Sequence, residues 1–233
     1  MKICINNKLI NRNKKIAQLT LYFSLALLAV GFIWTIRNPE PSKATVGYLI
    51  LVPSYLLVQV SIYLANRWGK SPRPDEIVTQ ALKGLDDKFT LYTYSTGVPN
   101  LLIGPIGILI INPYHHSGEI SYDVEKKRYV QKGGPNFLSK YFSQEGLPNI
   151  TKNSKSLKAK LLLYFSKNKI QNTEEPQIIN IFSSENVVLN TKNAPEIALK
   201  SEKLKDYIRK TKKNRKNICE NCESIKEKLP PAN

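Results

Sequence analysis

The residues best placed to do chemistry in this chain follow an apolar run at 107–111. Asn112 and Tyr114 stand two positions apart there, in the stretch GILIINPYHHSGEI. Side chains two apart on a strand project from the same face. A carboxylate and a lysine in this arrangement would hold a divalent cation and stabilise negative charge on a phosphate under attack. An amide and a phenol carry no charge, so we expect no metal at these two positions.

The two histidines of the chain, His115 and His116, follow directly. Adjacent residues on a strand point to opposite faces, so the two imidazoles are poorly placed to share one metal ion. We therefore expect a turn with exposed rings.

The polar stretch 118–134 carries three acidic residues, Glu119, Asp123 and Glu125, followed directly by basic residues. Together with Glu76 they would make a replacement acidic cluster for a metal. The basic neighbours at 126–128 favour a solvated face instead, and both readings stay open here.

Cysteines are sparse. Cys219 and Cys222 form a C-x-x-C pair, and Cys4 is the third. Three thiols with one close pair do not make a disulfide framework, which favours a reducing compartment. A structural zinc site needs about four ligands, and the chain has no second pair. We expect an inert reduced pair in a mobile tail, with a zinc site shared by two chains as the alternative.

A basic cluster lies at 209–216, in a chain of formal charge +17. It consists of Arg209, Lys210, Lys212, Lys213, Arg215 and Lys216. A disordered, solvated tail is one interpretation. The cluster would otherwise contact the phosphates of nucleic acid through charge alone, or anionic lipid head groups.

Two uncharged stretches, 17–36 and 46–66, are each long enough to cross a hydrocarbon core of about 30 Å as a helix. They predict a transmembrane hairpin with a short external loop at 37–45, which serves as an anchor. A signal peptide followed by a core helix is the alternative, but no small-residue cleavage site follows the first run. Basic residues precede the first run and follow the second: Lys2, Lys8, Arg12, Lys14, Lys15, Arg67, Lys70 and Arg73. This distribution predicts a two-span protein of the cell inner membrane with both termini cytoplasmic.

The rest of the chain divides into a basic cytoplasmic amino terminus (1–16), a proline-bearing linker (67–74), a cytoplasmic domain (75–209) and a basic tail (210–233). Within the domain, helical periodicity and β-forming runs alternate. Helices are expected at about 75–85, 137–145, 156–168 and 201–210, and strands at 89–95, 101–111, 118–134, 176–184 and 186–190. The fold class is α/β, a mixed sheet with flanking helices.

Three stretches of the domain resemble the nuclease-related domain (NERD) family of the restriction-endonuclease-like group. They are PDEIVTQALKGLDDKFTLYTY, LLIGPIGILIINPYHHSGEI and the closing INIFSSENVVL with KLKDYIRK. Gly104, Gly107 and Gly118 match the family in place and spacing. The resemblance covers roughly residues 74–209 and implies a restriction-endonuclease-like core.

The resemblance also implies where a nuclease site would lie. The family has an Asp on one strand and Glu-x-Lys on the next; the carboxylates hold Mg²⁺, and the lysine stabilises developing negative charge. Aligned on the glycines, the Asp position is Pro99, the Glu position is Asn112 and the Lys position is Tyr114. Only Glu76, on the opening helix, fits an acidic position of the family. We expect no confident catalytic residue, no metal and no cofactor at this degenerate site.

Three functions remain open from the sequence. The first is a catalytically inactive nuclease relative that binds nucleic acid or a protein partner at the membrane. The second is an active Mg²⁺-dependent nuclease with a displaced site built from Glu76 and the acids of 119–125. The third is a structural membrane module whose basic segments bind acidic lipid.

Overall fold

The computed structural model describes residues 1–135, 146–170, 175–214, 219 and 221–231. The chain divides into two compact units. One is helical and spans residues 7–73, and the other joins residues 1–6 to the described chain from Pro74 onward. The helix expected at 137–145 lies outside the described residues.

The helical unit consists of α1 (Asn7–Arg37), α2 (Pro41–Leu64) and the short π-helix η1 (Ala65–Gly69). Both α-helices are long and apolar enough to cross a membrane. They extend past the apolar runs that predicted them. Residues 7–16 are already helical, and α2 begins inside the stretch expected as a loop, with Pro41 at the start of the helix. Proline is favoured there because its fixed φ suits the first turn and its missing N–H would be unpaired anyway.

Small side chains form most of the seam between α1 and α2. The buried residues of α1 recur every seven positions, and those of α2 follow nearly the same spacing: Ile10, Ala17, Ser24, Gly31, and Ala44, Gly47, Ser54, Ser61. A seven-residue repeat keeps one stripe of a helix against its partner. Small residues let two helix backbones approach closely, which drives association where lipid removes the hydrophobic effect.

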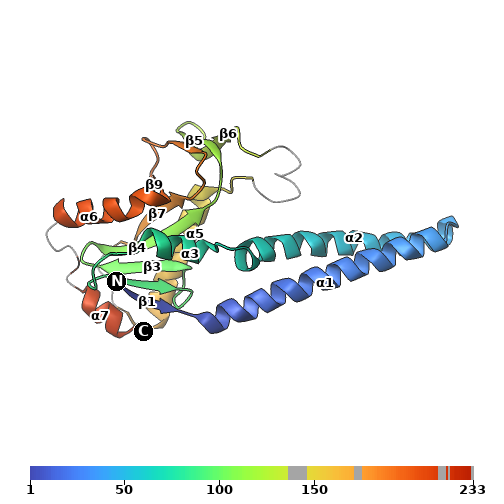
Figure 1. Ribbon diagram of the computed structural model, residues 1–233, viewed down its shortest axis with the longest axis horizontal. Helices are drawn as coiled ribbons and strands as arrows, with labels where there is room; N and C mark the ends of the chain where they lie inside the picture. Colours follow the sequence, from blue (N-terminus) through green and yellow to red (C-terminus); the bar gives the residue numbers. More distant parts are fainter. Residues whose placement is uncertain (136–145, 171–174, 215–218, 220, 232–233) are drawn as a thin grey trace. The chain divides into compact units, whose positions relative to one another are not determined.

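A six-stranded mixed sheet forms the centre of the second unit (Figure 1). Its order is β1-β2-β3-β4-β7-β9. These strands are β1 (Lys2–Ile5), β2 (Thr90–Thr93), β3 (Asn100–Gly104), β4 (Gly107–Tyr114), β7 (Gln177–Phe182) and β9 (Ile197–Lys200). The strand β3 runs antiparallel to β2 and β4, while β4, β7 and β9 are mutually parallel. This confirms the α/β class with a mixed sheet.

The strand β1 is not among the expected elements. It pairs in parallel with β2, from Lys2↔Thr90 to Ile5↔Thr93, and places Cys4 in the core. The segment expected only as a basic cytoplasmic terminus therefore supplies an edge strand to the domain. Four residues give too short a period-2 pattern to be read as a strand.

Helices cover both faces of this sheet. On one face lie α5 (Ile150–Lys167) and α7 (Cys222–Glu227), which pack with Leu161 and Ile225 against a shared apolar cluster. On the other lie α3 (Pro74–Ala81) and α6 (Leu204–Asn214), which pack with Val78 and Ile208 against a second cluster. Adjacent strand residues serve the two clusters alternately, as the pleat requires.

The domain extends beyond its expected end at 209. The helix α6 runs to Asn214, preceded by the 3-10 turn η2 (Ser201–Lys203), and α7 lies within the stretch expected as a tail. Cys222, Ile225 and Leu229 of that stretch are buried. Its apolar residues are few and widely spaced among lysines, so the sequence pattern did not predict a buried helix there.

A smaller three-stranded sheet, β6-β5-β8, adjoins the first. The strands β5 (Gly118–Asp123) and β6 (Arg128–Lys132) form the hairpin expected at 118–134, and β8 (Val187–Asn190) runs parallel to β5. Ile120, Tyr129 and Val187 share an apolar cluster with Tyr114 and Phe182 from the end of the main sheet.

Candidate functional site

Three elements bring together the side chains at the end of β4. Asn112 and Tyr114 lie on β4, and Asn180 lies on β7 directly opposite Asn112 in the parallel pair. Asn153 comes from α5, whose first turn is capped by the side chain of Asn149 accepting from Lys152 N at 2.9 Å. The strand register and the helix start thus direct four uncharged polar side chains to one place.

Hydrogen bonds connect these four residues into one network. The Nδ2 atom of Asn112 donates to the phenolic oxygen of Tyr114 at 2.6 Å and to Oδ1 of Asn180 at 3.4 Å. Asn153 donates through its own Nδ2 to the same phenolic oxygen at 3.1 Å. Two amides therefore converge on Tyr114 from a strand and a helix.

Aromatic neighbours enclose the phenol. The Tyr114 ring stacks on Phe182 with centroids 5.5 Å apart and meets His116 at 5.9 Å. Burial raises the pKa of Tyr114 to about 12, although the two amide donors act in the opposite direction. The phenol is thus neutral at any physiological pH, because burial penalises the phenolate.

The chemistry of this network follows from its neutrality. A divalent cation is held by carboxylate and carbonyl oxygens, and charge on a reacting phosphate is stabilised by an ammonium group. In this network the amide N–H groups already point at the phenol, and no member is charged. The arrangement is suited to holding β4, β7 and α5 together.

Pro99 lies at the same end of the sheet. It directly precedes β3, whose pairing with β4 ends at Leu101↔Ile110. Its carbonyl oxygen accepts from the backbone N–H of Tyr94 at 2.8 Å. Pro99, Asn112 and Tyr114 thus lie at the same end of the sheet, and a proline side chain offers no ligand atom.

Asn100 faces the other side of the sheet and is fully buried. Its cross-strand neighbour is Thr93, also fully buried. Within the described chain, neither the Asn100 amide nor the Thr93 hydroxyl has a hydrogen-bond partner. A buried polar group without a partner costs about 1–3 kcal/mol. This pair is a second polar feature of the core, separate from the network around Tyr114.

Glu76 belongs to α3, which packs through Val78 against the face opposite to Asn112 and Tyr114. The acids Glu119 and Asp123 lie on β5, in the smaller sheet. Across the described residues, no three His, Cys, Asp or Glu side chains gather in a way that could hold a metal ion. The structure thus does not assemble the acidic cluster that the sequence left open.

Asp123 has a local role instead. It accepts a 3.0 Å hydrogen bond from the backbone N–H of Lys126, and that bond holds the pKa of its carboxyl below the usual value. The acid therefore closes the β5–β6 turn, which agrees with the solvated-face interpretation.

The two histidines have different partners. Nδ1 of His115 lies 2.9 Å from Oγ of Ser183, and Nε2 of His116 lies 3.2 Å from the carbonyl oxygen of Gly146. The two rings thus do not converge on one site.

The basic cluster is partly engaged within the fold. Arg209, Lys210, Lys212 and Lys213 lie on α6, while Arg215 and Lys216 fall outside the described residues. The Arg209 guanidinium donates to the Gly84 carbonyl oxygen at 2.9 Å. Lys212 forms an ion pair with Asp86 and lies 5.8 Å above the Phe89 ring. Lys210 and Lys213 are exposed and suited to contact an external anion.

The C-x-x-C pair corrects an expectation. Cys219 and Cys222 form a disulfide with their Cα atoms 5.3 Å apart, rather than a reduced pair in a mobile tail. Cys222 is buried at the start of α7, and Cys219 packs against the same apolar cluster. The helix start brings the two thiols within bonding range.

Sequence reasoning did not single out Asn153 or Asn180. Asn180 carried a signal, because it interrupts the apolar run IINIF of a strand expected to be buried. An amide in such a run predicts a polar partner nearby. No sequence signal marked Asn153, since an asparagine in a lysine-rich helical stretch is expected to be exposed.

Comparisons with protein-family models, with curated proteins and with solved structures give no match.

Proposed function

We propose that this protein is a membrane-anchored, catalytically inactive relative of nuclease-like domains that acts as a binding module for nucleic acid or a protein partner. The observation that carries the proposal is the neutral network of Asn112, Tyr114, Asn153 and Asn180. Two of its members, Asn112 and Tyr114, stand at the positions where the NERD resemblance implies the glutamate and the lysine.

The arrangement of the central strands supports the restriction-endonuclease-like part of the proposal. Strands β2, β3 and β4 form an antiparallel meander, α5 crosses over, and β7 returns parallel to β4 (Figure 1). The glycines of the resemblance also have physical reasons. Gly107 and Gly118 have φ of 107° and 85°, and a Cβ at Gly104 would overlap the Phe89 ring. Such positions favour glycine over any other residue.

The anchoring part rests on α1 and α2. Two helices that both cross a membrane return the chain to the side on which it began. The strand β1 precedes α1 and α3 follows α2, yet both belong to the same compact unit. This favours a hairpin with both termini on one side, and the basic residues flanking the apolar runs favour the cytoplasmic side of the inner membrane.

The test uses the full chain in detergent micelles with Mg²⁺ or Mn²⁺ and labelled single- and double-stranded DNA and RNA. We expect no cleavage. We also expect salt-sensitive binding in fluorescence anisotropy, because Lys210 and Lys213 would release counterions from phosphates. Changing both to glutamate should weaken this binding, whereas the same change at Lys126 and Lys127 serves as the control.

Two outcomes select the other functions. Cleavage that is lost in Glu76→Ala selects the active nuclease with a displaced site. Salt-sensitive binding to vesicles of acidic lipid, without binding to nucleic acid, selects the structural membrane module.

A further inference from the structure

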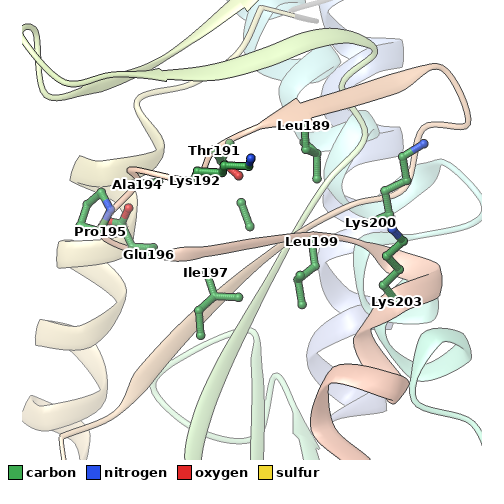
Figure 2. A pocket seen from close by; sticks show the side chains of 11 residues that line it. Leu189, Thr191, Lys192, Ala194, Pro195, Glu196, Ile197, Leu199, Lys200 and Lys203 are labelled. Atoms are coloured by element: carbon green, nitrogen blue, oxygen red, sulfur yellow. The ribbon is translucent and has the colours of Figure 1, made fainter. Parts of the chain in front are cut away.

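A cleft of about 510 Å³ opens beside β9 (Figure 2). All four residues of β9 contribute to its lining, together with Leu189, Lys203 and part of the 191–196 loop. The volume lies within the range of about 300–1,000 Å³ that is usual for binding sites.

The cleft follows the outer edge of the main sheet. β9 is the last strand in the sheet order and pairs with β7 on one side. In the part of the chain that the structure describes, no strand pairs with its other side. Consecutive strand residues point to opposite faces, so a cleft lined by all of 197–200 runs along the backbone edge. An edge strand directs part of its backbone N–H and C=O groups outward, where a further strand could pair with them.

Apolar side chains lie above and below this edge. Ile197 and Leu199 point to one side of β9 in Figure 2, and Leu189 lies on the other. Ile197 and Leu199 pack against one core cluster, while Leu189 packs against another. The side chains of an added strand would point alternately to the two sides, and on each side they would find an apolar residue of the cleft.

Charge around the cleft is mainly positive. Lys192, Lys200 and Lys203 line it, with Glu196 as the single acid of the lining. Oε2 of Glu196 accepts from the Tyr129 hydroxyl at 3.2 Å, which directs the carboxylate into the fold. The open surface of the cleft therefore favours a negatively charged occupant.

We propose that the edge of β9 is the docking site for an extended acidic segment of a partner protein, which adds a strand to the main sheet. Backbone hydrogen bonds would fix the segment, its apolar face would contact either Ile197 and Leu199 or, in the other register, Leu189, and its carboxylates would pair with the lysines. This mode of recognition gives affinity through the main chain and specificity through alternate side chains. The inference rests on the proposed binding role and names the kind of protein partner.

The test uses the full chain in detergent micelles and fluorescently labelled octapeptides of alternating valine and glutamate, one beginning with each residue. We expect saturable binding of at least one peptide in anisotropy and at least tenfold slower amide hydrogen exchange at residues 197–200. Replacing Lys200 and Lys203 together by glutamate should weaken binding at least tenfold. The same change at Lys167 and Lys169, exposed lysines outside the cleft, should change it less than twofold.

A peptide with N-methyl groups on alternate residues separates strand addition from charge attraction. It keeps the carboxylates and loses backbone donors, so its affinity should fall at least tenfold. Equal binding of the methylated peptide, or exchange at 197–200 that neither octapeptide slows, overturns the proposal. Nucleic-acid cleavage would instead overturn the loss of catalysis and leave the result at β9 unchanged.

Discussion

The Nδ2 atom of Asn112 donates a 2.6 Å hydrogen bond to the phenolic oxygen of Tyr114, two residues further along β4. In a nuclease of the resembling family the same two positions hold a carboxylate and a lysine. In this chain two neutral groups stand at these positions and bond to each other. An internal bond of this kind stabilises the strand end without any ion.

Replacing Tyr114 by phenylalanine should destabilise the domain by about 1–3 kcal/mol, because the amides of Asn112 and Asn153 would lose their common acceptor in a half-buried place. Chemical denaturation of the full chain, followed by fluorescence, measures the change. Tyr122→Phe is the matched control, since that ring makes an edge contact with Tyr129 that phenylalanine retains. Equal losses in the two variants would show that the network contributes nothing.

Replacing Thr93 by valine should stabilise the domain by about 1–3 kcal/mol, since the hydroxyl is fully buried without a hydrogen-bond partner in the described chain. Valine keeps the shape and removes the polar atom. Thr79→Val is the control, because the Thr79 hydroxyl donates to the Asp75 carbonyl oxygen at 2.9 Å. The valine there removes a hydrogen bond and should not stabilise the domain. A lower melting temperature for the Thr93 variant would mean that an ordered water satisfies the hydroxyl.

The hairpin of β3 and β4, with its turn between two glycines, is a feature that the sequence predicts correctly. Apolar runs on either side of Gly104 and Gly107 predicted β3 and β4, and the structure pairs these glycines directly. Period-2 patterning and turn residues involve only a few neighbouring positions, so they can be recognised from the sequence without the tertiary structure. The predicted strands and the glycine alignment together were enough to place Pro99, Asn112 and Tyr114 at one end of the sheet.

The hydrogen-bond partners of Asn112 and Tyr114, namely Asn180 and Asn153, could not be predicted from the sequence. Asn180 reaches Asn112 only because β7 pairs with β4 in one register, and Asn153 only because α5 begins at Ile150. Contacts across 68 residues depend on topology rather than on local pattern. The same holds for β1 and α7, whose short segments are held in place by the core that they join.

Replacing Gly47 by valine should disrupt the α1–α2 hairpin, because even a Cβ at this position would overlap the Thr35 side chain and contact the Gly31 backbone. Overpacking of this kind costs about 1–3 kcal/mol. Unfolding of the full chain by sodium dodecyl sulfate, followed by circular dichroism, measures the loss. Gly69→Ala is the control, since its nearest neighbour would lie 3.8 Å away. If both variants resist the detergent equally, the two helices do not depend on close approach.

Replacing Asp86 by asparagine should lower stability in a pH-dependent way. The hydrogen bond from Lys212 holds the pKa of the Asp86 carboxyl below its usual value. A carboxyl with a depressed pKa in the folded state stabilises it above the unfolded pKa, near 4, and this contribution is lost as pH falls through the folded pKa.

Both side chains of this pair are partly exposed, so solvent screens it and we expect a loss of about 0.2–1 kcal/mol at pH 7. Urea unfolding of the full chain at pH 7 and at pH 3 measures the difference, which should shrink at the lower pH. A cycle with Lys212→Met isolates the pair from other effects of each change, and Glu185→Gln at an exposed loop position controls for net charge. A loss that is the same at both pH values, or that persists when Lys212 is already methionine, would assign it to something other than the ion pair that docks α6 onto the turn before β2.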